Sequence, residues 1–388
     1  MQDRSTMPAS QIPNLLSLRG KSRPHSHAKR RTGAGDASQN NDLDIQGTDT
    51  DAAVSRLSAV SLGYLTDQYA SSFVKGPNIR RLPVINRGTG TYTRTTALDT
   101  LIEAFLSPHD TTLPKKRKQI ISLGAGTDTR YFRLRDKNQH LELIYHEFDF
   151  PSVSRIKKQI VTTNSAFLQP SDCVYSPPVP FESENKSEEN EWGILQGEGT
   201  LQQVLYYFHP LDLREMSKLP FTKVSGLCSD IPTLIISECC LCYMDISQSS
   251  RVIKWFMENI PSIGIILYEP LGSDDSFGKM MVKNLAARNI FMPSLTFYKS
   301  LSDQRERLSE FGFKDNCPKT GCKAETIENI WEEWVPFTEK ERLQQLEGLD
   351  EVEEWQILAR HYAISWGWKC DTDEWNWVNF RAIENKSQ

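Results

Sequence analysis

Residues 120–130 read Ile120-Ile121-Ser122-Leu123-Gly124-Ala125-Gly126-Thr127-Asp128-Thr129-Arg130, a short apolar run that leads directly into a glycine-rich turn. Glycines between a strand and a helix let the backbone approach a ligand closely, and the helix presents free N–H groups. A dinucleotide site would require a third glycine at position 129, where Thr129 stands. The turn therefore suits a nucleoside without a pyrophosphate, such as S-adenosylmethionine. A plain tight turn is the alternative interpretation.

The rest of the chain alternates between short strand-like runs and helical sequence. The expected strands are Gln119–Leu123, Leu141–Phe148, Val204–Phe208, Thr233–Ser237, Ile263–Tyr268 and, late in the chain, Tyr362–Trp366. Helical spacing of apolar residues marks residues 52–74, Ala97–Leu106, Glu341–Leu346 and Val352–Arg360. Strands separated by helices predict an α/β fold with a doubly wound, mostly parallel sheet.

The composition excludes several classes of protein. A net charge of −5 argues against a body that binds nucleic acid. No apolar run approaches the roughly 18 residues that a membrane span requires. The first residues also lack the apolar segment of a secretion signal, so we do not expect a secreted protein. The eight cysteines then indicate reduced thiols, although a redox pair or a metal site at Cys239–Cys242 stays open. We expect a cytoplasmic monomer without a metal, in which Lys29-Arg30-Arg31 is either a nuclear-import signal or a solvated tail.

Two stretches lack the periodicity of a folded segment. Residues 1–51 are polar, with a basic part followed by an acidic one, and predict a disordered charged tail. Removal of residues 1–50 is accordingly expected to leave activity and stability nearly intact. Residues 176–200 combine prolines with glutamates and predict a flexible acidic loop on the surface. The folded domain is therefore expected over residues 52–388.

Acidic residues stand where three further expected strands end. Asp149 follows the second strand, and in such folds a carboxylate there accepts both ribose hydroxyls of a nucleoside. Capping of the helix that starts near Pro151 is the alternative role. Asp212 follows the third strand, where an adenine amino group would lie, and Glu238 ends the fourth, with Tyr243 on the next turn. Because parallel strands end at one edge, these residues predict a single nucleoside site.

Several blocks of sequence, in order along the chain, resemble the leucine carboxyl methyltransferase family. They are Ile85-Asn86-Arg87-Gly88, Tyr92-Thr93-Arg94, Ser122–Thr129, Glu147–Pro151, Glu238–Met244 and Arg360-His361-Tyr362. The resemblance runs from about Ala52 to Trp366, is of the fungal type, and makes Thr89-Gly90 an insertion that we expect in a loop. It implies a Rossmann-like class I S-adenosylmethionine-dependent methyltransferase domain over residues 52–388, with a helical lid over residues 52–110.

The resemblance also implies an activity and a set of site residues. Enzymes of this family use S-adenosylmethionine to methylate the C-terminal leucine of the protein phosphatase 2A catalytic subunit. The implied cofactor contacts are Arg56, Arg94, Gly124, Gly126, Asp149, Asp212, Leu213 and Glu238. Arg56 stands where relatives carry lysine, so a planar fork replaces a point charge. We expect Arg94 and Tyr243 to hold the acceptor carboxylate, which is already ionised at pH 7 and requires no general base.

Other functions stay open at this stage. A related enzyme carboxymethylates a modified tRNA base in the wybutosine pathway, but those relatives carry a β-propeller after the methyltransferase domain, and this chain stops at Gln388. A secondary-metabolite O-methyltransferase is a further enzyme alternative. From another class, the chain could be a catalytically inactive phosphatase-binding protein, against which the retained Gly124, Asp149 and Glu238 argue.

Overall fold

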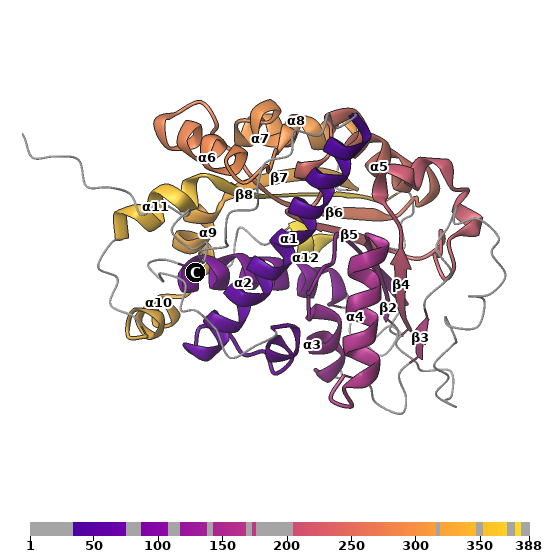
Figure 1. Ribbon diagram of the computed structural model, residues 1–388, viewed down its shortest axis with the longest axis horizontal. Helices are drawn as coiled ribbons and strands as arrows, with labels where there is room; N and C mark the ends of the chain where they lie inside the picture. Colours follow the sequence, from indigo (N-terminus) through magenta and orange to yellow (C-terminus); the bar gives the residue numbers. More distant parts are fainter. Residues whose placement is uncertain are drawn as a thin grey trace, which may run out of the picture.

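The computed structural model describes most of the chain in one α/β arrangement (Figure 1). The described residues are 34–74, 87–107, 117–137, 143–167, 173–175, 205–315, 319–346, 352–370 and 377–381. The expected acidic loop at residues 176–200 lies outside these ranges. No helix within them is long and apolar enough to cross a membrane.

An eight-stranded sheet organises the described residues, in the order β3-β4-β2-β1-β5-β6-β8-β7. The strands are β1 Lys118–Leu123, β2 Leu143–Asp149, β3 Cys173–Tyr175, β4 Leu205–Pro210, β5 Thr233–Glu238, β6 Ile263–Pro270, β7 Thr320–Thr326 and β8 Tyr362–Lys369. Strands β3, β4, β2, β1, β5 and β6 pair in parallel, whereas β8 runs antiparallel to both β6 and β7. The predicted mostly parallel sheet is confirmed.

Helices connect these strands and cover both faces of the sheet (Figure 1). The α-helices are α1 Ala34–Ser61, α2 Arg87–Leu106, α3 Arg130–Asp136, α4 Pro151–Thr163, α5 Ile246–Asn259, α6 Ser276–Ala286, α7 Pro293–Phe297, α8 Leu301–Glu310, α9 Ile327–Trp334, α10 Phe337–Gln344, α11 Val352–Arg360 and α12 Val378–Arg381. Short 3-10 turns are η2 Ala70–Phe73, η3 Leu213–Lys218, η4 Phe221–Lys223 and η5 Leu241–Tyr243.

The two faces of the sheet bury separate cores. Ile120 packs with α2, α3 and α9, whereas its neighbour Ile121 packs with α5 and α8. Successive side chains of a strand point to opposite faces, so a continuous apolar run is what a strand covered on both sides requires. This doubly wound arrangement leaves the carboxyl ends of β1, β2, β4 and β5 as one edge for a ligand.

Two strands were not predicted from the sequence. Strand β3 is short, and β7 reads Thr-Gly-Cys-Lys-Ala-Glu-Thr, with no clear alternation of apolar and polar residues. Strand β7 lies at the edge of the sheet and pairs along its whole length with β8. The neighbouring strand, rather than its own propensity, therefore decides its conformation.

The prediction of a disordered tail over residues 1–51 is wrong from Ala34 onward. There the chain forms α1, which packs on α2. Helix α1 is drawn in indigo and crosses in front of the sheet in Figure 1. Residues 34–51 carry no apolar stripe at helical spacing. Hydrogen bonds and ion pairs from their polar side chains attach this part of α1 to the rest of the protein. Residues 1–33 lie outside the described residues.

The expected loop at Thr89-Gly90 is also wrong, because both residues belong to the first turns of α2. Thr89 is buried, and its carbonyl accepts a hydrogen bond from the Thr93 hydroxyl at 2.8 Å. The insertion is thus absorbed into a helix. Arg94 is consequently held on a regular helix rather than on a loop.

Candidate active site

A cavity of about 1320 Å³ lies at the carboxyl edge of the sheet. Residues from α1, α2, the turn after β1, the ends of β2, β4 and β5, and helices α6 and α11 line it. The site residues predicted from the sequence all reach this one cavity. They are Arg56, Arg94, Gly124, Gly126, Asp149, Asp212, Leu213, Glu238 and Tyr243. The structure thus brings the residues from the four strand ends together, and their role as a nucleoside site stays a prediction.

The glycine-rich turn after β1 uses both of its glycines. Gly124 and Gly126 have φ angles of +64° and +44°, in the left-handed region that side chains disfavour. A Cβ atom on Gly124 would lie 2.5 Å from the Cys240 sulfur, and one on Gly126 would lie 2.2 Å from Oδ1 of Asp49. The turn therefore brings bare backbone to the cavity wall.

Asp149 holds this turn rather than capping the next helix. Its Oδ2 accepts the N–H of Gly126 and its Oδ1 accepts the N–H of Phe150, both at 2.7 Å. The N-cap residue of α4 is Phe150, so the helix-cap interpretation of Asp149 is not supported. Burial raises the pKa of Asp149 to about 6, against the lowering effect of the two N–H groups, and Asp49 raises it further.

Glu238 sits between two arginines at the end of β5. Its Oε1 lies 2.8 Å from Nε of Arg94, and its Oε2 accepts from Nη2 of Arg130 at 3.2 Å. Burial opposes the charge of Arg94, but Glu238 raises the net pKa of that guanidinium above its ordinary value. The Arg94 guanidinium also lies 5.3 Å from the centre of the Tyr268 ring. Arg94 is therefore held rigidly and partly neutralised.

Arg56 is a buried cation with unused hydrogen-bonding capacity. It is 7% exposed and lines the cavity, with ion-pair distances of 3.6 Å to Asp67 and 3.8 Å to Asp128. Burial lowers the pKa of Arg56, and Asp128 only partly offsets this. Its Nη1 has no hydrogen-bond partner among the described residues. A buried donor of this kind calls for an acceptor supplied by a ligand.

Asp212 and Leu213 begin η3 on another wall of the cavity. Asp212 caps this turn by accepting the N–H of Arg214 at 2.9 Å, and it also accepts the Arg214 guanidinium. The same guanidinium reaches Asp42 of α1 at 2.7 Å. The Asp212 carboxylate is thus fixed in place, while the buried Leu213 side chain supplies an apolar surface.

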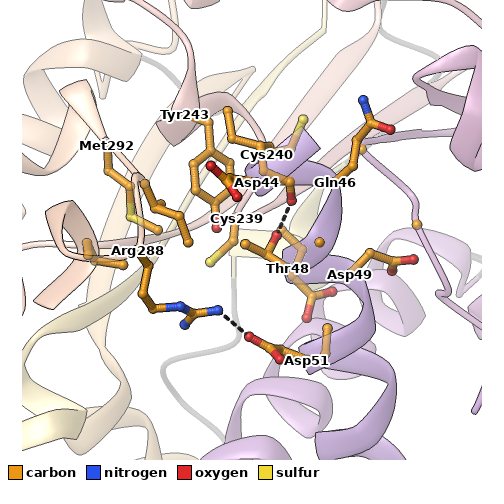
Figure 2. Close-up of a pocket in the computed structure, with 18 of the residues that line it drawn as sticks. Asp44, Gln46, Thr48, Asp49, Asp51, Cys239, Cys240, Tyr243, Arg288 and Met292 are labelled. Carbon is orange, nitrogen blue, oxygen red and sulfur yellow. Dashed lines mark hydrogen bonds and ion pairs between the residues drawn. The ribbon is translucent and has the colours of Figure 1, made fainter. Parts of the chain in front are cut away.

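Tyr243 lies in η5 and faces the cavity (Figure 2). Burial raises the pKa of Tyr243 well above its ordinary value, and its hydroxyl interacts with the side chain of Thr48 from α1. Tyr243 therefore stays a neutral hydroxyl that can donate one hydrogen bond.

Cys239, which follows Glu238, has a φ of +51°, a strained conformation for a residue with a side chain. The described cysteines of this turn are free thiols.

Sequence reasoning missed one wall of the cavity, the polar face of α1. Figure 2 shows Asp51 of this helix pointing toward Arg288, which follows α6. The two side chains form an ion pair at 2.5 Å. Similar contacts tie α1 to several parts of the body: Asp42 to Arg214, Asp44 to Asn289, Gln46 to Ser152, and Asp49 to Thr127. The only sequence signal was a run of acidic residues, which by itself indicates a solvated tail as readily as a binding face.

Known proteins similar to this chain agree with one another. The family model described as leucine carboxyl methyltransferase matches residues 44–257. Leucine carboxyl methyltransferase 1 of Emericella nidulans is 40% identical over 387 residues, covering 94% of this chain and 95% of that protein. The relative of the same name from Schizosaccharomyces pombe is 34% identical, covering 87% and 97%. The Arabidopsis thaliana homologue is also 34% identical, covering 85% and 90%.

A solved structure of human N-acetylserotonin methyltransferase in complex with SAM is a more distant match. It aligns with a TM-score of 0.35 and 12% identity, over 73% of this chain and 54% of that chain. The family assignment rests on the sequence relatives, which match most of the chain.

Proposed function

The chain belongs to the leucine carboxyl methyltransferase family, and we propose that it uses S-adenosylmethionine to methylate the C-terminal leucine of the protein phosphatase 2A catalytic subunit. The membership makes it an enzyme of this type. The observation that carries the proposal is the convergence of the glycine turn, Asp149, Asp212 and Glu238 on one cavity. The substrate and the cofactor are our inference from the family and from the chemistry of that cavity.

The residues present fit S-adenosylmethionine. The two left-handed glycines leave room beside the backbone, and Asp149 provides acceptors at the end of β2. The buried Nη1 of Arg56 lacks a partner among the described residues, and the cofactor's carboxylate would supply one. Asp212 and Leu213 offer a polar and an apolar contact for a base. We assign these residues to binding of the cofactor.

When bound, S-adenosylmethionine would supply an electrophilic methyl group on a sulfonium sulfur, which would leave with the bonding electron pair as the acceptor carboxylate becomes the methyl ester. No proton moves, because the acceptor carboxyl group is ionised well below pH 7. The protein must therefore position and desolvate the acceptor rather than deprotonate it.

Arg94 and Tyr243 are suited to that positioning. The negative charge of the acceptor carboxylate and the positive charge of the sulfonium both decrease in the transition state. An unpaired arginine bound to both acceptor oxygens would therefore stabilise the ground state more than the transition state. Glu238 already pairs with Arg94, which limits the charge that Arg94 can offer. Tyr243 can donate a neutral hydrogen bond. Together they can orient a carboxylate without fully neutralising it.

Transfer of labelled methyl to the phosphatase catalytic subunit tests this proposal. A methyl ester is cleaved by mild alkali, whereas a methylated amine or arginine is stable to it. We expect label on the phosphatase that mild alkali releases as methanol. Label that survives alkali, or no label on a phosphatase that a known family member methylates, would contradict the proposal.

A further inference from the structure

Two carboxylates from different parts of the chain hold adjacent N–H groups of the glycine-rich turn. Asp149 accepts from Gly126, while Oδ1 of Asp49 accepts the N–H of Thr127 at 2.7 Å and its hydroxyl at 2.8 Å. Asp49 lies in α1, far from the turn in sequence. Its carboxylate stands directly over the place where the turn has no side chain, since a Cβ atom on Gly126 would meet it at 2.2 Å.

Asp49 differs from Asp42 and Asp51 of its helix in having no cation paired with it among the described residues. Asp42 pairs with Arg214 and Asp51 pairs with Arg288. The contacts of Asp49 within the described part of the chain all fall on Oδ1, which leaves Oδ2 free to accept. Asp49 is half-buried and lines the cavity. A partly desolvated carboxylate beside a second carboxylate is costly unless a positive group lies near both.

The same helix provides a complementary charge two turns further on. Arg56 follows Asp49 by seven residues, so both lie on one face of α1. Both residues line the cavity, and the buried Nη1 of Arg56 has no hydrogen-bond partner among the described residues. This face of α1 therefore presents an anion and a cation to the same cavity. Such a pair matches a zwitterion, which is the form of an α-amino acid group.

We propose that Asp49 binds the α-ammonium group of the amino acid part of S-adenosylmethionine through its free oxygen. The assignment rests on the proposed function and extends it. It makes α1 part of the cofactor site instead of a cover over it. The contact of Asp49 with Thr127 sets the carboxylate on the turn before the ligand arrives, so little ordering remains to be done on binding.

Two ligands that differ in the amino acid part separate this role from a structural one. S-adenosylhomocysteine carries the ammonium and carboxylate groups, and 5′-methylthioadenosine carries neither. Asp49→Asn keeps an oxygen that can accept from Thr127 but removes the negative charge. We expect this variant to bind S-adenosylhomocysteine at least about tenfold more weakly by calorimetric titration, with 5′-methylthioadenosine affinity changed less than about twofold. Asp49→Glu is expected to recover part of the loss.

Asp51→Asn is the matched control, because it removes the same charge from α1 but breaks a contact with Arg288 instead. We expect it to treat both ligands alike. Equal weakening of both ligands by Asp49→Asn would show that Asp49 only docks the helix and would overturn the proposal. Tighter binding of S-adenosylhomocysteine would overturn it too, because Asp49 would then compete with the ligand's carboxylate. Failure of the wild-type protein to bind either ligand would instead refute the cofactor assignment on which this inference depends.

Discussion

The Nε atom of Arg94 lies 2.8 Å from Oε1 of Glu238, so an arginine that lines the cavity is held by a carboxylate that lines the same cavity. Glu238 is also bound by Arg130, which is almost fully buried. The position of the Arg94 guanidinium is therefore fixed by Glu238 of β5, which is itself held by Arg130 of α3. A role in positioning follows from this arrangement more directly than a role in neutralising charge.

Arg94→Lys is expected to lower turnover by about a hundredfold. Lysine keeps the charge but loses the planar fork, and a misplacement near 1 Å can cost about this much. Because no general base is required, the pH profile of the variant between about 6 and 8 should parallel that of the wild type. Steady-state kinetics check both points. Near-normal turnover would make Arg94 a structural cation, and a new steep pH dependence would reveal a base.

Asp149→Asn should bind S-adenosylhomocysteine at least tenfold more weakly while the domain stays folded. In our proposal Asp149 accepts ribose hydroxyls, and hydrogen bonds to a charged acceptor are worth about 1.5–3 kcal/mol each. Asparagine can still accept one of the two backbone N–H groups that Asp149 holds. Calorimetry and circular dichroism together test this. Unchanged affinity in a folded variant would limit Asp149 to holding the turn.

Cofactor affinity is expected to fall as the pH drops through about 6. Burial raises the pKa of Asp149 to about 6, and Asp49, Lys157 and Cys240 are the titratable groups that face it. Below this pH the carboxyl group is protonated and loses acceptor strength, so affinity should fall up to about tenfold between pH 7 and pH 5. Titrations of wild type and Asp149→Asn at both pH values check this. An equal fall in the variant would assign the effect to another group.

Protonation of Asp149 should have the opposite effect on the folding stability of the ligand-free protein: it weakens cofactor binding but favours folding. A carboxyl group whose pKa is higher in the folded than in the unfolded state favours folding when it is protonated. The contribution of Asp149 to stability is therefore present below about pH 4 and is lost as the pH rises through about 6. Comparing the melting temperatures of wild type and Asp149→Asn isolates this contribution: we expect the wild type to lose stability relative to the variant as the pH rises from about 4 to about 7.

Removal of residues 1–50 should weaken cofactor binding by more than tenfold and lower the melting temperature by several degrees. The deletion takes away Asp42 and Asp49, which tie α1 to Arg214 and to the glycine-rich turn. This reverses the expectation drawn from composition alone. Removal of residues 1–33, which leaves α1 whole, is the control and should keep both properties. An intact response to S-adenosylhomocysteine after the longer deletion would contradict the role given to α1.

The strand-end residues could be predicted from sequence because their signal is local. Gly124, Asp149 and Glu238 each stand directly after an apolar run, and the topology of a parallel sheet brings such ends together. Helix α1 could not be predicted in this way. Most of its residues that line the cavity are polar and follow no apolar stripe, and its partners Arg214 and Arg288 lie 172 and 237 positions away. The spacing of residues within α1 carries no information about partners so far away in the sequence.

The central claim is that this chain esterifies the terminal leucine of the phosphatase 2A catalytic subunit. The most direct test compares methyl transfer to the intact catalytic subunit and to one that lacks only this leucine. We predict that the intact subunit gains one alkali-labile methyl group on its C-terminal peptide, located by mass spectrometry, and that the shortened subunit gains none. Equal methylation of the two, or a methyl group placed elsewhere in the subunit, would contradict the account.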